Sequence, residues 1–289
     1  MLAVSDLISH RFRGFGEEEN TIGSMRGALD WGVEIVEFDV RMAKCGTPMV
    51  YHDEHAPAKT AMRYLSRVMA RDFDAQGGRF RSMPTLDDLL QSAADHPNPA
   101  RLLVDVKDAG FEEAIVALVR YHRLQDRVVY VSWLPEVLYA VSDLEPEAAL
   151  CFSHWASSPT MGARATHTVL TSRDGRVERP TPTPFGTRSG WWLRQMLTGG
   201  LADRIARNGG YVCVPAKDVS HNLVAAYHAI GIGVSAFSYV DIGPAAAARD
   251  ETGLDLLFSD SKRLFEQVQR SGTEVSSAIG ASPSRPGMA

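Results

Sequence analysis

Residues 34–40 read Glu-Ile-Val-Glu-Phe-Asp-Val, an apolar and β-branched run in which two carboxylates stand two positions apart. Residues 101–107, Arg-Leu-Leu-Val-Asp-Val-Lys, form a second run of the same kind. Such runs are typical of strands in a buried parallel sheet. Six more occur along the chain, at residues 4–9, 127–132, 147–153, 211–214, 232–238 and 254–258.

Helical patterns separate most of these strands. They occupy residues 21–31, 85–94, 111–122, 135–143, 219–230, 243–252 and 261–270. Eight strands that alternate with helices predict an α/β fold of the TIM (β/α)8 barrel type. Because each element continues the same alternation, we expect one barrel domain over residues 1–270.

Three stretches depart from this alternation. Residues 49–51 follow a turn-like tetrad and predict a short hairpin strand after strand 2. Residues 153–210 are longer than an ordinary connection and predict an insertion after strand 5. Residues 271–289 are rich in Ser, Gly and Pro, so they predict a disordered tail.

The composition narrows the possible functions. The chain has 289 residues, 45% of them hydrophobic, and a formal net charge of −5, as a soluble globular protein would have. No run of Lys and Arg suggests nucleic acid as a partner, and no stretch has the ~18 apolar residues that a membrane span needs. The first residues lack a secretory signal pattern, and the scattered Cys45, Cys151 and Cys213 fit a reducing compartment. We therefore expect a cytoplasmic location.

Carboxylates gather at the ends of two predicted strands, where the active site of such a barrel lies. Glu37 and Asp39 occupy alternate positions of the second strand, so their side chains point the same way, and Asp105 lies near the end of the third. Carboxylates in one barrel mouth repel each other unless a cation lies between them, and an all-oxygen set favours Mg²⁺ or Ca²⁺. These three residues are candidate ligands of one divalent cation. The alternative is a buried Glu37 paired with Arg11 or Lys107 without a metal.

Two histidines and two cations stand beside these carboxylates. His10 ends the first strand and His52 ends the hairpin strand, so both are candidates for general acid and base. Arg11 and Lys107 are candidates for holding the phosphate of a substrate. Together the group suits cleavage of a phosphodiester, because cations offset charge in the transition state and histidines move protons.

Other polar and aromatic residues receive simpler interpretations. Trp133 and Tyr239 follow strand ends and are expected to line the pocket. Arg13 and Arg41 are interpreted as solvated surface charges. The remaining histidines are interpreted as structural or exposed: His55, His96, His122, His154, His167, His221 and His228.

The ordered motifs of the first third resemble the glycerophosphodiester phosphodiesterase family. Its HR, ENT, ExD and HD elements are similar to Ile8-Ser9-His10-Arg11, Glu19-Asn20-Thr21, Glu37-Phe38-Asp39-Val40 and Val50-Tyr51-His52-Asp53. Its PTL, ExK and closing GxD…TD elements are similar to Pro84-Thr85-Leu86, Val104-Asp105-Val106-Lys107, and Gly253-Leu254-Asp255 with Phe258-Ser259-Asp260. The resemblance implies a TIM barrel with one divalent metal that hydrolyses a glycerophosphodiester to an alcohol and glycerol 3-phosphate. It also implies a route in which the neighbouring glycerol hydroxyl attacks phosphorus, a cyclic phosphate forms, and His10 and His52 exchange the protons.

Three departures from the family pattern leave other functions open. Asp105 stands where the family usually has Glu, Phe237 stands in place of Trp, and residues 55–60 replace an Arg-Thr-Thr element. One alternative is a phosphodiesterase of the same barrel type that acts on a lysophospholipid or a sugar phosphodiester. Another is a catalytically weak barrel that binds a phosphorylated ligand. The alcohol moiety, the choice between Mg²⁺ and Ca²⁺, and the oligomeric state stay open.

Overall fold

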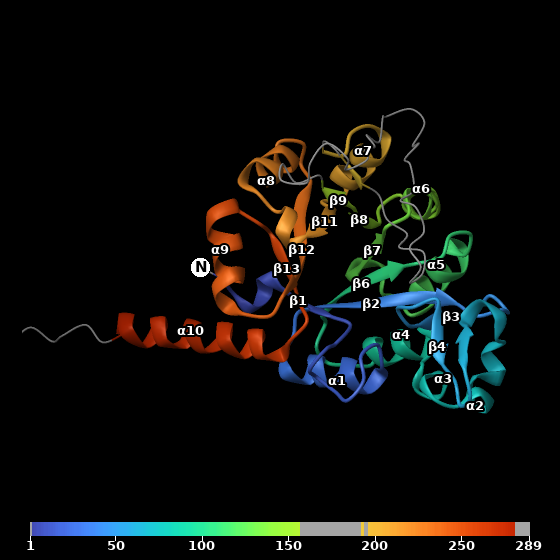
Figure 1. The fold of residues 1–289 in the computed structure, drawn as a ribbon. Helices are drawn as coiled ribbons and strands as arrows, with labels where there is room; N and C mark the ends of the chain where they lie inside the picture. Colours follow the sequence, from blue (N-terminus) through green and yellow to red (C-terminus); the bar gives the residue numbers. More distant parts are fainter. Residues whose placement is uncertain (1, 157–191, 194–195, 281–289) are drawn as a thin grey trace, which may run out of the picture.

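A closed ring of eight parallel strands forms the centre of the molecule (Figure 1). The computed structural model describes residues 2–156, 192–193 and 196–280. The strands are β1 (Leu7–His10), β2 (Ile35–Met42), β6 (Arg101–Val106), β7 (Val128–Ser132), β8 (Ala149–Ser153), β11 (Tyr211–Pro215), β12 (Gly233–Tyr239) and β13 (Leu256–Ser259). Strand β1 pairs with both β2 and β13, which closes the ring. The predicted TIM barrel is confirmed.

The start of the first strand differs from the prediction. Residues Val4–Asp6 form a 3-10 helix, η1, and the strand begins only at Leu7. The Asp6 carboxylate accepts a hydrogen bond from the Ala3 backbone N–H at 2.8 Å, and the Asp6 N–H bonds to the Ala3 carbonyl. These local bonds favour a turn over an extended backbone at these residues.

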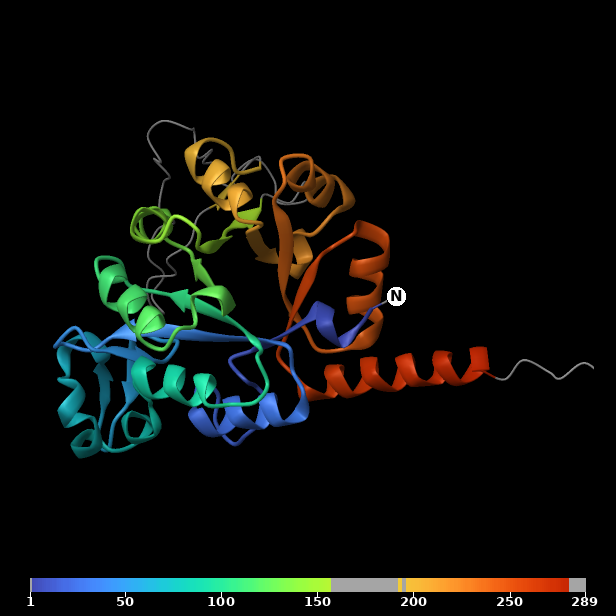
Figure 2. The same ribbon diagram turned by 180° about the vertical axis from the view of Figure 1, so that it is seen from behind.

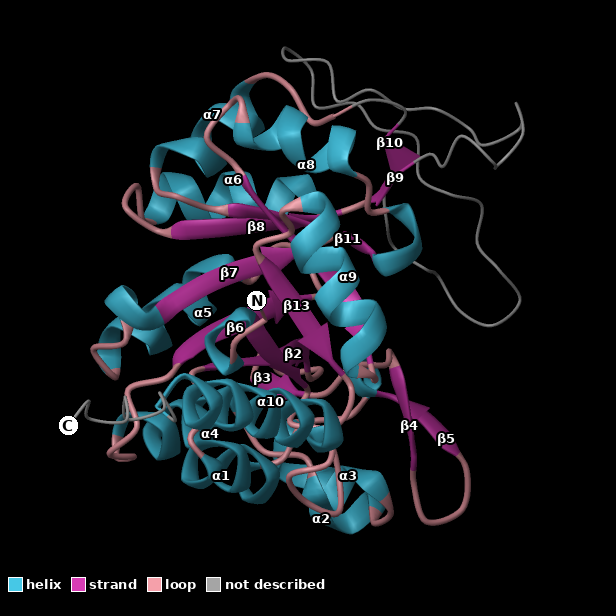
Figure 3. Cartoon of the chain, turned by 90° about the vertical axis from the view of Figure 1, so that its left-hand side faces the viewer, coloured by secondary structure: helices cyan, strands magenta, loops and turns pink. Residues whose placement is uncertain are grey.

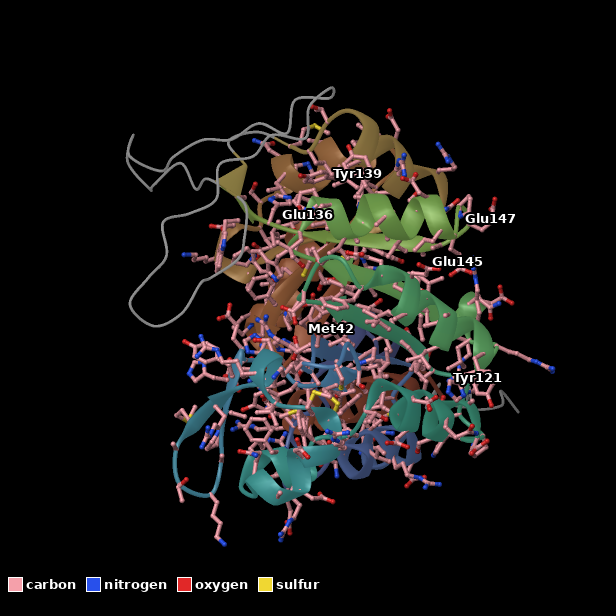
Figure 4. All side chains as sticks on the ribbon, turned by 90° about the vertical axis from the view of Figure 1, so that its right-hand side faces the viewer. Met42, Tyr121, Glu136, Tyr139, Glu145 and Glu147 are labelled. Carbon is pink, nitrogen blue, oxygen red and sulfur yellow. The ribbon has the colours of Figure 1, made fainter. Side chains whose placement is uncertain are left out.

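Helices cover the outside of the barrel (Figure 2). They are α1 (Ile22–Trp31), α4 (Leu86–Ala94), α5 (Glu112–Tyr121), α6 (Pro135–Leu144), α7 (Gly200–Arg207), α8 (His221–His228), α9 (Ile242–Thr252) and α10 (Lys262–Gly280). Two of them start where the sequence predicts, since the Thr21 and Thr85 hydroxyls accept the N–H groups of Ser24 and Asp88. Tyr139 and Glu145, labelled in Figure 4, hold helix α6 in place. The Arg204 guanidinium of α7 lies 5.0 Å from the Tyr139 ring centroid. The Tyr130 hydroxyl of β7 donates a hydrogen bond to Glu145, which directly follows α6.

The last helix is longer than the sequence predicts. Helix α10 continues to Gly280, so the first part of the stretch predicted to be disordered is helical. Residues 281–289 lie outside the described part of the chain. Between residues 2 and 280, no described helix combines the length and apolarity needed to cross a bilayer.

A small subdomain follows β2. Strand β3 (Pro48–Val50) pairs antiparallel with β2 outside the ring, which confirms the predicted hairpin. A second hairpin, β4 (His55–Pro57) and β5 (Met62–Tyr64), and two short helices, α2 (Phe73–Gln76) and α3 (Arg79–Ser82), were not predicted (Figure 3). This subdomain has a small hydrophobic core of its own, in which Phe73 and Phe80 pack edge to face. Short 3-10 helices complete the fold at Leu65–Arg67, Ala70–Asp72, Gln125–Arg127 and Ala216–Asp218.

The long connection after the fifth ring strand carries three described elements. Strands β9 (Trp155–Ala156) and β10 (Trp192–Leu193) pair parallel, and α7 follows them. Helix α7 lies within the stretch predicted as an insertion, for which the sequence predicted no helix. Residues 157–191 and 194–195 lie outside the described residues.

The side chains of β2 alternate between two environments. Val36, Phe38 and Val40 are buried in the outer core beneath the helices, whereas Ile35 packs inside the barrel. Period-two alternation therefore turns Glu37 and Asp39 toward the barrel interior. The register pairs Asp39 with Asp105 of β6, which brings the third carboxylate to the same level.

Candidate active site

A cavity of about 510 Å³ opens at the carboxyl ends of the barrel strands. Its polar part brings together six of the seven predicted site residues: His10, Arg11, Glu37, His52, Asp105 and Lys107. The seventh, Asp39, is fully buried and pairs with Arg11 and Lys107 of the cavity lining. The predicted site is therefore one physical place, contributed by β1, β2, β6 and the segment after β3.

Three buried carboxylates form the floor of this cavity. Oxygen atoms of Glu37, Asp39 and Asp105 all lie within 4.8 Å of one another. Burial, and then the two neighbouring carboxylates, raise the pKa of Glu37 well above its usual value. Burial also raises the pKa of Asp105. Among the described residues, Oδ1 of Asp105 has no hydrogen-bond partner although it is buried. A buried, unsatisfied carboxylate oxygen beside two others fits a hard divalent cation.

Two cations neutralise one of these acids. Arg11 Nε lies 3.1 Å from Asp39 Oδ2, and Lys107 Nζ lies 2.9 Å from Asp39 Oδ1. Burial alone would raise the pKa of Asp39, but Lys107 and Arg11 hold it well below its usual value. Lys107 also pairs with Asp105, while no described ion pair joins Glu37 to Arg11 or Lys107. The metal-free pairing of Glu37 considered from the sequence is therefore not what the structure contains.

The loop between β1 and α1 fixes Arg11 and Asp39. Asn20 donates to Asp39 Oδ2 at 2.8 Å, and the Asn20 N–H bonds to the Arg11 carbonyl. The Arg11 N–H in turn donates to Glu37 Oε2 at 3.1 Å. Arg11 and Asn20 both have positive φ, at 56° each, a conformation that this closed set of hydrogen bonds maintains.

His10 is held by a residue that the sequence analysis did not place in the site. Its Nδ1 lies 2.6 Å from Asp260 Oδ1, and its Nε2 lies 3.8 Å from Glu37 Oε2. Asp260 also accepts hydrogen bonds from Arg13 at 2.7 Å and from Ser238 at 2.5 Å. Burial lowers the pKa of His10, because it disfavours the charged ring, although the hydrogen bond to Asp260 acts in the opposite direction. With its Nδ1–H donated to Asp260, the ring presents an unprotonated Nε2 to the cavity.

Arg13 and Arg41 are not the solvated charges that the sequence suggested. Arg13 belongs to the Asp260 group described above. Arg41 donates to the His52 carbonyl at 2.9 Å and pairs with Asp108 at 2.7 Å, with its side chain only 11% exposed. The alternation of side chains in β2 was the signal that could have placed Arg41 on the same face as Glu37 and Asp39.

His52 lies at the opening of the cavity. Its side chain is 36% exposed, and its Nδ1 lies 2.7 Å from Asp53 Oδ1. Each of the two predicted histidines thus has an aspartate at Nδ1 and its other nitrogen available. They differ in depth, since His10 is 14% exposed. His55, interpreted from the sequence as structural or exposed, also lines the cavity.

An aromatic wall forms another side of the cavity. It consists of Trp133, Trp155 and Phe237, whose ring centroids lie 5.1 Å, 5.7 Å and 6.1 Å apart in the three pairs. The prediction that Trp133 lines the pocket is confirmed. Tyr239 lies instead in a shallow groove against α9, outside this cavity.

Comparison with known proteins gives one consistent result. The model of the glycerophosphoryl diester phosphodiesterase family matches residues 8–174. The "Probable glycerophosphodiester phosphodiesterase 2" of Mycobacterium tuberculosis is 28% identical over 80% of this chain and 78% of its own length.

Solved structures agree on the fold. A protein from Silicibacter pomeroyi, assigned to the glycerophosphoryl diester phosphodiesterases, superposes with a TM-score of 0.70 at 21% identity and covers 93% of this chain and 94% of its own. An Oleispira antarctica phosphodiesterase, solved with the product sn-glycerol-3-phosphate, superposes with a TM-score of 0.64 at 19% identity and covers 92% of this chain and 96% of its own. Since the family match spans more than half of the 289 residues, the chain belongs to the glycerophosphoryl diester phosphodiesterase family.

Proposed function

We propose that this protein is a metal-dependent phosphodiesterase that hydrolyses a glycerophosphodiester to an alcohol and glycerol 3-phosphate. The observation that carries this proposal is the convergence of three buried carboxylates, the half-buried cations Arg11 and Lys107, and His10 in one cavity. Membership of the family supports the same substrate class.

One divalent cation, Mg²⁺ or Ca²⁺, would be held by Glu37, Asp39 and Asp105. The charge balance of the site supports this assignment, because three carboxylates face only two cations, Arg11 and Lys107. When bound, such an ion would stabilise negative charge on the phosphate oxygens. Arg11 and Lys107 would then serve both as partners of Asp39 and as positive charges facing the substrate phosphate.

The two histidines suit a two-step route. In the first step, one histidine takes the proton of the neighbouring glycerol hydroxyl as its oxygen bonds to phosphorus, and the other protonates the leaving alcohol. The bond from phosphorus to that alcohol breaks and a cyclic phosphate forms. In the second step water opens the ring, the histidines reverse roles, and glycerol 3-phosphate is released. The free Nε2 of His10, with Asp260 holding Nδ1, suits the transfer in the depth of the cavity.

The direct test follows both products from glycerophosphocholine. We expect release of choline and glycerol 3-phosphate that stops with EDTA, returns with Mg²⁺ or Ca²⁺, and is lost in His10→Ala and His52→Ala. Turnover that persists in EDTA or in His10→Ala would contradict the proposal. Absence of turnover in the metal-loaded protein would favour the weak phosphate-binding barrel.

The aromatic wall favours a second candidate substrate, a lysophospholipid. A cage for a quaternary ammonium needs open space between ring faces, and a cation binds within about 6 Å of a ring centroid. The rings of Trp133, Trp155 and Phe237 pack against one another at 5.1–6.1 Å, so they present an apolar surface. Rates with glycerophosphocholine and with a lysophospholipid, in wild type and Trp133→Ala, distinguish the two. If a lysophospholipid is the substrate, Trp133→Ala should lose more activity on the lipid than on glycerophosphocholine.

A further inference from the structure

The β4–β5 hairpin projects from the rim of the molecule and carries an unusual set of charges (Figure 3). Residues 55–71 contain Lys59, Arg63, Arg67 and Arg71 but no Asp or Glu, in a chain whose net charge is −5. We define residues 55–67 as the basic hairpin. It is a local positive surface on an acidic protein.

Three cations of the basic hairpin form no described ion pair with a carboxylate. Within residues 2–156, 192–193 and 196–280, no ion pair to a carboxylate involves Lys59, Arg63 or Arg67, and all three are exposed. Of the acids that flank the hairpin along the chain, Asp53 pairs with His52 and Asp72 with Arg71. The three positive charges therefore face solvent.

Apolar side chains stand between these charges. Met62 is 55% exposed and Tyr64 is 46% exposed. In the described part of the chain, six large hydrophobic residues are exposed to a comparable degree, and two of the six lie in the three-residue strand β5. The Tyr64 ring is held between His55, at 5.6 Å, and the Arg67 guanidinium, at 5.1 Å. A fixed tyrosine at the base of the hairpin and an exposed methionine next to its turn lie among these cations, so the hairpin is amphipathic.

We propose that the basic hairpin docks this protein onto an anionic lipid surface. Lys59, Arg63 and Arg67 bind lipid phosphates, and Met62 and Tyr64 enter the region between headgroups and acyl chains. A bilayer suits this surface better than a nucleic acid or an acidic protein, because the headgroup region takes up the exposed methionine and tyrosine while the lipid phosphates bind the free cations. The inference does not depend on the hydrolysis proposed above.

Docking there brings the catalytic cavity to the interface. His55 lines the cavity and is also the first residue of β4, where it pairs with Tyr64. The base of the basic hairpin is thus part of the cavity opening. A diester with an apolar chain reaches the cavity directly from the surface to which the hairpin is bound.

The experiment is co-sedimentation of the full chain with vesicles. We compare phosphatidylcholine vesicles with vesicles in which about a third of the lipid is phosphatidylglycerol, at low and high salt. The test variant is Lys59→Glu/Arg63→Glu/Arg67→Glu. The matched control is Arg26→Glu/Arg123→Glu/Arg207→Glu, which makes the same charge change at exposed residues that also lack a described ion pair with a carboxylate. Hydrolysis of a water-soluble diester and circular dichroism verify that each variant is folded.

We expect wild type and the control variant to bind the anionic vesicles and not the neutral ones. The hairpin variant should bind about a hundredfold more weakly. Each cation near an anionic lipid surface usually contributes about 1 kcal/mol to binding, and this variant loses three. Met62→Ser/Tyr64→Ser should weaken binding about tenfold while keeping every charge. Equal binding of wild type to both vesicle types, or equal loss in the hairpin and control variants, would overturn the proposal. Tighter binding to polyuridylate than to vesicles, with the same dependence on the three cations, would also overturn it.

Discussion

His10 Nδ1 and Asp260 Oδ1 lie 2.6 Å apart although 250 positions separate them in the chain. His10 ends β1 and Asp260 directly follows β13, and these two strands are neighbours in the ring. Asp260 also accepts hydrogen bonds from Arg13 and Ser238, so two further groups fix its carboxylate in front of the imidazole. Asp260 is therefore a positioning residue that sets which nitrogen of His10 faces the cavity.

Replacement of Asp260 by Asn should damage catalysis more than binding. An amide can donate to Nδ1, which would move the proton to Nε2 and leave the ring unable to accept one in the cavity. We expect kcat to fall between about 10²- and 10⁴-fold with little change in KM, by analogy with other aspartate–histidine pairs. Steady-state kinetics over a range of pH measure this. Ser238→Ala, which leaves the Asp260–His10 bond intact, is the control, and a kcat of Asp260→Asn within twofold of wild type would refute the positioning role.

Two neighbouring carboxylates should respond oppositely to loss of charge. Burial and adjacent acids raise the pKa of Glu37, so without a metal its negative charge is unfavourable. Glu37→Gln should raise the melting temperature of the EDTA-treated protein and remove the stabilisation that Mg²⁺ or Ca²⁺ gives to wild type.

Asp39→Asn should instead destabilise the metal-free protein by about 3 kcal/mol, since it leaves the half-buried Arg11 and Lys107 without their shared partner. Calorimetric melting with and without the cation measures both variants. If both shifts have the same sign, the assignment of Asp39 as the neutralised acid and Glu37 as the uncompensated one is wrong.

A buried histidine should make stability depend on pH. His154 Nε2 accepts a hydrogen bond from the Tyr227 hydroxyl at 2.8 Å, and its Nδ1 faces the Trp155 carbonyl at 3.2 Å. Burial lowers the pKa of His154 to about 4, from an ordinary value of 6.5. The unfolded chain then takes up a proton first, so this stabilisation is complete above pH 6.5 and is lost as the pH falls toward 4.

The loss should reach about 3 kcal/mol. Urea unfolding at several pH values measures it. The carboxylates contribute to the pH dependence of both wild type and His154→Gln, so the difference between the two unfolding free energies reports His154 alone. Gln is chosen because it keeps a neutral acceptor for the Tyr227 hydroxyl. Parallel pH curves for the two proteins would show that His154 does not contribute.

Two glycines in α1 should respond oppositely to alanine. A Cβ at Gly27 would lie 2.2 Å from the Phe15 carbonyl oxygen, whereas a Cβ at Gly23 would meet nothing within 4 Å. Helix propensity favours alanine at both positions. We expect Gly23→Ala to stabilise by about 0.5 kcal/mol and Gly27→Ala to destabilise by about 2 kcal/mol or more.

Chemical unfolding of the two variants provides the measurement. Gly27→Ala should also lower activity, because Phe15 belongs to the loop that carries Arg11 and Asn20. A stabilising effect of Gly27→Ala would show that α1 does not approach this loop as described.

The barrel could be predicted from the sequence because each buried strand is a continuous apolar run, and period-two alternation then places Glu37 and Asp39 on the inner face. The same reasoning reaches Asp105, His10 and Lys107. It missed Asp260 as a partner of His10, since a contact across 250 positions follows only from closing the ring. The β4–β5 hairpin was missed because its strands have three residues each, too short to show a periodic pattern. A cytoplasmic location stays a prediction.

The position of β13 has a consequence for the order of synthesis. The strand that directly precedes Asp260 is the last of the ring, and it lies between β12 and β1. A ribosome has made the histidines, the acidic triad and the lysine long before this strand emerges. A nascent chain can thus hold every other part of the site while its barrel is still open and His10 still lacks its partner. Activity should therefore switch on late in translation, with the arrival of the final strand.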